Sequence, residues 1–168
     1  LELEGSDFEV SVAPCEPGLN GADSVRFLFS ANGRAPEELS KVASGGEISR
    51  IMLSIKAIMA RFLGMPTLIF DEIDTGVSGS VADKMGRMIC SMGKDMQAFA
   101  ITHLPQVAAK GSAHYLVSKS TKAQGRTSST LSRIEGEDRV REIARLLSGS
   151  TISQSALANA EQLLNENL

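Results

Sequence analysis

A short apolar strand that ends in acidic residues constrains this chain more than any other feature. The run TLIF at 67–70 is followed at once by Asp71, Glu72 and Asp74. A run this short and apolar is typical of a strand inside a parallel sheet that is covered on both faces. Carboxylates so close together repel one another unless a cation or a reacting group lies between them. The sequence therefore predicts a buried strand with a functional site at its carboxyl end.

The segments around this strand alternate between helices and strands. Apolar residues recur at the helical spacing over about 46–63 and again over about 80–93. Further apolar strands are expected at 97–102 and 114–120, with a short helix at 104–110 between them. This order implies right-handed crossovers and a parallel sheet that holds all three strands.

The two ends of the chain have different patterns. Alternating apolar residues predict two antiparallel strands at 7–13 and 25–30, joined by a loop of turn-forming residues at 14–23. A strand at about 128–134 and amphipathic helices at about 137–148 and 153–166 are expected to follow. We therefore expect an α/β fold: a mostly parallel sheet flanked by helices, with antiparallel strands at its N-terminal and C-terminal edges.

Composition excludes several classes of protein. The chain has 168 residues, about one domain, and is 42% hydrophobic, which is enough for a packed core. A net charge of −3 gives it no general affinity for nucleic acid or anionic membranes. No run approaches a membrane span, and Cys15 and Cys90 lack metal-ligand spacing. We expect a soluble, cytoplasmic protein with no membrane partner. Because the chain starts at Leu1 without an initiator methionine, we also expect a piece of a longer protein.

The carboxyl ends of the first two apolar strands hold the candidate catalytic residues. Asp71 and Glu72 follow one strand and His103 follows the next. Ligands of doubly wound sheets bind at such ends, so these side chains are expected to share one edge. Acidic loops after strands are often merely solvated, but a histidine one strand later makes that alternative less favourable.

A glycine-rich helix start is a second candidate site. Ser44 and Glu47 fit a capping box, and Gly45 and Gly46 let an anion approach the unpaired N–H groups of the first turn. An ordinary helix cap is the alternative. The usual phosphate-binding pattern G-x-x-x-x-G-K-[ST] occurs nowhere in the chain. The sequence thus carries part of a nucleotide site without its main phosphate-binding loop.

Four motifs in order resemble those of ABC-type ATPases. They are the signature motif LSKVASGGE at 39–47, the Walker B strand and acids at 67–72, the D-loop at 73–79 and the switch-histidine loop at 101–103. The combination KVASGGE, LIFDEIDTGVSG and THLPQVAAKG is narrower than that superfamily. With REIARLLSG at 141–149, it resembles the C-terminal ATPase head lobe of the SMC-like RecN family of DNA repair proteins, over about 7–165.

The resemblance implies a role for each acidic or basic candidate. Asp71 would hold Mg²⁺, and Glu72 would orient or deprotonate the water that attacks the γ-phosphate of ATP. His103 would contact the γ-phosphate and sense its presence. Asp74 would act across a dimer interface.

The signature residues Ser44, Gly45, Gly46 and Glu47 would, by the same resemblance, cap ATP bound to a second head. Two heads would pack head-to-tail as a homodimer around two nucleotides. Residues 1–168 would form the C-terminal lobe, and the Walker A lobe and the coiled coil would lie outside this chain. The full-length protein would contact DNA in double-strand-break repair and recombination, and the isolated lobe is expected to be inactive.

Two other functions fit part of the sequence. A metal-dependent nuclease or phosphohydrolase could use Asp71, Glu72, Asp74 and His103 as ligands, but it leaves the Ser-Gly-Gly-Glu segment without a role. A non-catalytic interaction module is the second alternative, and it is compatible with an isolated lobe that is inactive.

Overall fold

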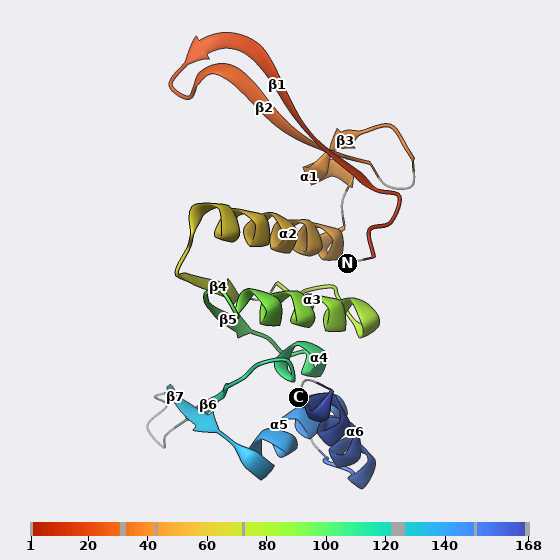
Figure 1. Ribbon diagram of the computed structural model, residues 1–168, viewed down its shortest axis with the longest axis vertical. Coiled ribbons are helices and arrows are strands. Elements are labelled where there is room, and N and C mark those ends of the chain that lie inside the picture. Colours follow the sequence, from red (N-terminus) through yellow and green to blue (C-terminus); the bar gives the residue numbers. More distant parts are fainter. Residues whose placement is uncertain are drawn as a thin grey trace.

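The computed structural model describes residues 2–30, 33–42, 44–71, 73–121, 127–149 and 151–166. In this part of the chain the elements, in order, are β1 (Asp7–Gly18), β2 (Gly21–Ser30), β3 (Glu37–Glu38), α1 (Leu39–Val42), α2 (Gly45–Leu63), β4 (Thr67–Asp71), α3 (Gly79–Met92), β5 (Gln97–Ile101), α4 (Pro105–Ala108), β6 (His114–Thr121), β7 (Thr127–Ile134), α5 (Gly136–Ser148) and α6 (Gln154–Asn165). Figure 1 shows them stacked from the β1–β2 hairpin at one end to α5 and α6 at the other. The predicted α/β class is confirmed.

The N-terminal strands form a long antiparallel hairpin that projects beyond α2 (Figure 1). Their register runs from Asp7 opposite Ser30 to Gly18 opposite Gly21, with an irregularity between Pro14 and Gly18. The predicted loop at 14–23 is therefore wrong, because most of its residues continue the strands. A bulge lets a strand absorb a proline and an extra residue without ending, which the turn-forming composition did not reveal.

Helix α2 begins and ends as the sequence predicts. Ser44 is its N-cap and forms both hydrogen bonds of a capping box with Glu47. Gly64 ends it in the left-handed conformation, with its N–H bonded to the carbonyl of Ala60. These local signals set the two ends of the helix.

Strands β4 and β5 form the parallel sheet, paired from Thr67 with Gln97 to Asp71 with Ile101. Phe70 of β4 is fully buried against the helices on one face of this sheet. The buried residues of this core are Leu53, Ala57, Ala60, Phe70, Ala82, Met85, Ile89, Met92 and Val107. Alternation along the strands places every second side chain on the opposite face.

That opposite face is open among the described residues. Ile69, Phe99 and Ile101 share it and are 60%, 44% and 55% exposed. The expectation that this sheet is covered on both faces is therefore wrong for the described part of the chain. Parallel sheets with one bare apolar face are unusual in complete domains, so this face is a candidate for burial by another polypeptide segment.

The prediction that the strand at 114–120 joins the parallel sheet is wrong for β6. This strand pairs antiparallel with β7, from His114 opposite Ile134 to Thr121 opposite Thr127, in a separate sheet. Parallel neighbours need a crossover that is usually a long helix. Helix α4 has only four residues and packs against α3 and α5, so the chain moves on to a new sheet instead of returning to β5.

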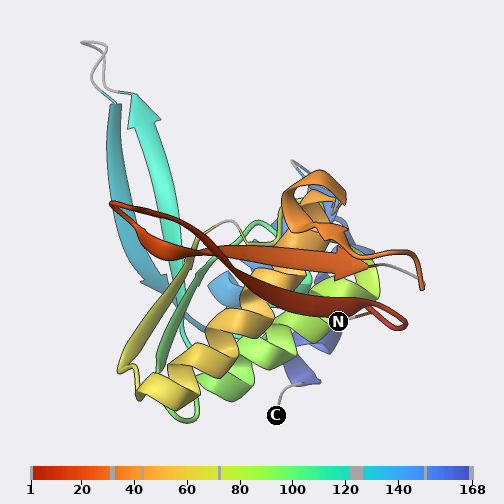
Figure 2. The ribbon, with the colours of Figure 1, turned by 90° about the horizontal axis from the view of Figure 1, so that it is seen from above.

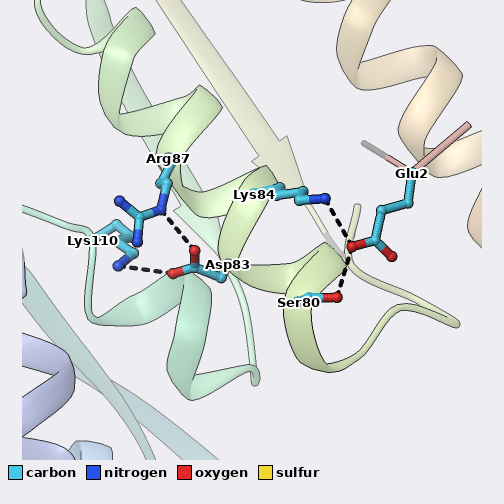
Figure 3. Close-up of polar contacts among 6 residues, drawn as sticks. All are labelled: Glu2, Ser80, Asp83, Lys84, Arg87 and Lys110. Carbon is cyan, nitrogen blue, oxygen red and sulfur yellow. Dashed lines mark hydrogen bonds and ion pairs between the residues drawn. The ribbon is translucent and has the colours of Figure 1, made fainter. Parts of the chain in front are cut away.

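A buried lysine joins α4 to α3 (Figure 3). Lys110 is 5% exposed, and its Nζ lies 2.8 Å from Asp83 Oδ1, while Arg87 Nε lies 2.7 Å from Asp83 Oδ2. The hydrogen bond from Lys110, followed by that from Arg87, lowers the pKa of the Asp83 carboxyl. A Cβ at position 86 would lie 2.9 Å from Lys110 Cγ, so Gly86 allows this close approach.

The N-terminal segment is held to the first turns of α3. The Glu2 carboxylate accepts a hydrogen bond of 2.8 Å from Ser80 and one of 2.9 Å from Lys84 (Figure 3). This exposed contact is separate from the Asp83 contacts, and it ties the start of the chain to the parallel-sheet unit.

Helices α5 and α6 pack against each other and form a second core. Its buried residues are Ala109, Ile143, Ala144, Ala156 and Ala160. Among the described residues, none of the helices is long and apolar enough to span a membrane. Figure 2 shows the β6–β7 pair extending away from the helices, on the side where β4 and β5 lie.

Candidate functional site

The candidate residues gather at the carboxyl ends of β4 and β5. Asp71 ends β4 opposite Ile101, and its side chain is exposed. His103 follows two residues after Ile101, and its side chain is 72% exposed. Glu72, the expected catalytic acid, lies outside the described residues. Asp71 and the loop that carries His103 thus share one edge of the sheet, as expected from parallel pairing.

Asp74 lies in the turn that follows β4 and points inward. The residue is 2% exposed, and its Oδ2 accepts a short hydrogen bond from the hydroxyl of Thr102. The same hydroxyl oxygen accepts a hydrogen bond of 3.0 Å from the N–H of Leu104. The Asp74 carboxylate therefore connects the turn after β4 to the loop after β5.

The second oxygen of Asp74 faces His103. Asp74 Oδ1 lies 3.9 Å from His103 Nδ1, which is beyond hydrogen-bond distance. Within the described part of the chain, this buried oxygen has no hydrogen-bond partner. Because the carboxylate is held within its own chain here, its expected action across a dimer interface stays a prediction.

The start of α2 presents the signature residues to solvent. Ser44 is exposed, and its N–H and hydroxyl donate hydrogen bonds of 2.8 Å and 2.7 Å to Glu47 Oε2. The backbone N–H of Ser44, and then its hydroxyl, lowers the pKa of the Glu47 carboxyl. Glu47 thus orients Ser44 in this structure, and a second molecule can reach the helix start.

The start of α2 also touches the turn after β4. A Cβ at position 46 would lie 2.7 Å from the carbonyl oxygen of Gly76, closer than real Cβ contacts come. Gly76 has a φ of 73° in a turn that the hydrogen bond from Val77 N–H to Asp74 O closes at 3.1 Å. The two glycines therefore bring the signature helix and the Asp74 turn into backbone contact.

Asp71 fits a magnesium ion better than a protein-only metal cage. Among the described residues, no group of three or more histidine, cysteine or acidic side chains is arranged to hold a metal ion. Mg²⁺ needs only one or two carboxylates when phosphates and waters supply its other ligands. The exposed carboxylate of Asp71 at a strand end suits that arrangement.

A cavity of about 200 Å³ lies elsewhere, between β6, β7 and the start of α5. It is lined by Ser112, Ala113, His114, Arg133, Ile134, Glu135, Gly136 and Arg139. Arg133 is paired with Glu135 at 2.8 Å, and Arg139 donates to the carbonyl of Gly111 at 2.7 Å. Burial, and then the charge of Arg139, lowers the pKa of His114. None of the candidate site residues lines this cavity.

Thr102 is a residue that the sequence analysis named only as part of the histidine loop. Its hydroxyl is the donor that binds Asp74 across 28 positions of sequence. The sequence feature that could have marked Thr102 as a site residue is its position directly before His103 at a strand end. Nothing in the sequence, however, indicates that Thr102 contacts Asp74. Only the hydrogen bond in the structure shows it.

Comparison with curated proteins finds relatives along nearly the whole chain. The chain is 42% identical over 167 residues to the DNA repair protein RecN of Vibrio cholerae, covering 98% of this chain and 30% of that protein. It is 43% identical over 173 residues to RecN of Xylella fastidiosa strain 9a5c, covering 99% and 30%. The chain therefore spans about a third of the length of these relatives. No model of a protein family matches it.

Comparison with solved structures shows the fold. One neighbour comes from work on ATP-driven dimerization and DNA-stimulated activation of SMC ATPases; it has a TM-score of 0.62 and 18% identity, and the match covers 88% of this chain and 85% of that one. The Smc head domain with a coiled coil and joint from Pyrococcus yayanosii has the same TM-score and identity, over 98% of this chain and 26% of that one. The chain thus has the fold of an SMC head lobe.

Proposed function

Because the chain is related over nearly its whole length to the RecN family of DNA repair proteins, we propose that it is the C-terminal lobe of an ATP-hydrolysing head. The first lobe, with the phosphate-binding loop, belongs to another part of the longer protein. Residues 1–168 contribute the signature, Walker B, D-loop and histidine-loop segments of that head.

The bare face of the β4–β5 sheet is the observation that carries this proposal. Ile69, Phe99 and Ile101 form an apolar surface on a parallel sheet that, in the described part of the chain, has helices packed on one side only. Exposed apolar surface of this kind marks a site of association. About 70% of the length of the relatives lies outside the matched region, since 30% is covered, so a covering lobe has ample chain to come from.

Within its own head, the strand-end edge acts on ATP. Asp71 is the ligand of Mg²⁺, which neutralises phosphate charge when bound with the nucleotide. Glu72 orients or deprotonates the attacking water, and His103 contacts the γ-phosphate. The exposure of Asp71 and His103 at the shared sheet edge supports these roles.

The start of α2 acts on a second head. Gly45 and Gly46 direct their N–H groups and the positive helix end towards the γ-phosphate of ATP in the partner, and Glu47 orients Ser44 beside them. The exposure of Ser44 supports this outward role. Two such heads pack head-to-tail around two nucleotides, and hydrolysis opens the pair.

DNA is contacted by the full-length protein, not mainly by this lobe. The net charge of −3 gives the lobe little attraction for phosphate backbones. The relatives are DNA repair proteins, and we place this protein with them in the repair and recombination of double-strand breaks, in the cytoplasm at the bacterial nucleoid.

Reconstitution from two separate lobes tests the proposal. The chain alone should hydrolyse no ATP, and the N-terminal lobe that carries the phosphate-binding loop should also be inactive alone. Mixing the two should restore hydrolysis, because only the pair completes the site. As a matched control, Ile69→Glu places a charge on the bare face and should prevent both assembly and hydrolysis.

Two outcomes would contradict the proposal. If the two lobes form a complex but the mixture does not hydrolyse ATP, the proposed catalytic role of this chain is wrong. Metal-dependent cleavage of nucleic acid without nucleotide would favour the nuclease alternative.

A further inference from the structure

The carboxylate of Asp74 has one satisfied oxygen and one unsatisfied oxygen. Oδ2 accepts the hydroxyl proton of Thr102, while Oδ1 is buried without a hydrogen bond in the described part of the chain. A buried carboxylate oxygen without a donor is unfavourable, so a structure normally supplies a partner. The ring of His103 is the group placed to supply one, since its Nδ1 lies 3.9 Å away.

We propose that Asp74 is a positioning residue for His103. Thr102 holds the Asp74 carboxylate in place, and Asp74 accepts a hydrogen bond from Nδ1–H of His103 when ATP is bound. This inference rests on the proposed function, because it assigns His103 to the γ-phosphate. A small rotation of the exposed imidazole closes the distance to a hydrogen bond. With Nδ1 held by Asp74 on one side of the ring, the opposite nitrogen, Nε2, is turned towards the γ-phosphate.

The surroundings of Asp74 hold the carboxylate rigidly enough for this task. Thr102 precedes His103 directly, so the hydroxyl that binds Asp74 also fixes the backbone that carries the ring. On its other side, the Asp74 turn is closed by Val77 and lies against the start of α2 through Gly76. A carboxylate fixed by its own turn and by the histidine loop can orient an exposed ring that little else restrains.

The two sites of the proposed head are connected by this arrangement. Gly46, at the signature helix, touches Gly76, and Asp74 of the same turn reaches His103. The Asp74 turn therefore lies between the signature helix and the histidine loop of the same chain.

Steady-state ATP hydrolysis by variants of the full-length protein tests the inference. Asp74→Asn keeps the size of the side chain and an oxygen for Thr102 but removes the charge. We expect kcat to fall about 10- to 100-fold with KM for ATP changed little, as for partners that orient histidines at metal sites. Thr102→Val should give a similar loss, and Thr102→Ser, which keeps the hydroxyl, should stay within about twofold of the wild type.

A double-mutant cycle with His103→Ala separates positioning from a purely structural role. If Asp74 acts through His103, adding Asp74→Asn to His103→Ala should lower kcat no further. If the two losses multiply, or if Thr102→Ser is as impaired as Thr102→Val, the inference is overturned. Should Asp74→Asn fail to fold by circular dichroism, the same cycle with Thr102→Val decides, because Thr102 is only half-buried.

Asp71→Asn distinguishes failure of this inference from failure of the proposed function. If Asp71→Asn hydrolyses ATP as fast as the wild type, the proposed function is wrong and the inference falls with it. If Asp71→Asn is inactive while the Asp74 and His103 losses multiply, only the inference is wrong.

Discussion

Replacing Glu72 with glutamine in the full-length protein should nearly stop ATP hydrolysis and leave two heads held together around bound ATP. Glutamine keeps the size of the side chain but cannot accept a proton from the attacking water. Loss of a general base typically costs about 10²–10⁴-fold in rate. ATP binding is untouched, so the closed pair should accumulate. Phosphate release and size-exclusion chromatography with ATP measure the two effects.

Glu161→Gln is the matched control for this prediction. Glu161 is exposed on α6, away from the carboxyl ends of β4 and β5. The control should hydrolyse ATP normally and dissociate after each cycle. Undiminished turnover by Glu72→Gln would count decisively against the role given to Glu72.

Replacing Ser44 with arginine should abolish the ATP-dependent pairing of heads. Ser44 is exposed at the start of α2, where the account places the nucleotide of the second head. An arginine there fills the space needed for that phosphate and its approaching lobe, and ATP hydrolysis should fall with pairing. The lost N-cap should lower the free energy of unfolding by only about 1 kcal/mol.

Ser153→Arg controls for the loss of the cap itself. Ser153 is the N-cap of α6, where its hydroxyl accepts a hydrogen bond from Ala156 N–H at 3.1 Å. Urea unfolding should show similar small losses for both variants, while sedimentation with ATP should show pairing only for Ser153→Arg. If the two variants pair equally well with ATP, the start of α2 is not part of the dimer interface.

Local patterns predicted the parts of the fold that short-range contacts determine. The limits of α2 followed from Ser44, Glu47 and Gly64, whose hydrogen bonds all lie within one turn of the helix ends. The parallel pairing of β4 with β5 followed from two short apolar strands joined by a helix long enough to cross back.

The wrong predictions concern features that depend on contacts between residues far apart in sequence or on segments outside this chain. β6 was predicted in the same sheet as β4 and β5, but it pairs with β7 in a separate sheet, and α4 before it has only four residues. The bare face with Ile69 and Phe99 could not be foreseen, because apolarity predicts that a face is buried without saying which molecule covers it.

The sequence predicted where the candidate site lies in the fold but not which of its side chains contact one another. Asp71 and Asp74 look equivalent in the sequence, three residues apart after one strand. The structure exposes Asp71 and buries Asp74, because a hydroxyl 28 positions away, on Thr102, binds only the second. No periodicity or local spacing carries that information.

A mixing experiment tests most directly whether the strand-end acids and the start of α2 serve ATP in different molecules. Asp71→Asn and Ser44→Arg proteins, each inactive alone, are combined before ATP is added. If the motifs act in opposite heads, every mixed pair contains one intact site. Hydrolysis should then return, to at most about a quarter of the wild-type rate: with random pairing half the pairs are mixed and half of their sites are intact, and the single Ser44→Arg site weakens the closure of each mixed pair. If the mixture stays as inactive as its components, the two motifs act within one head and the account is wrong.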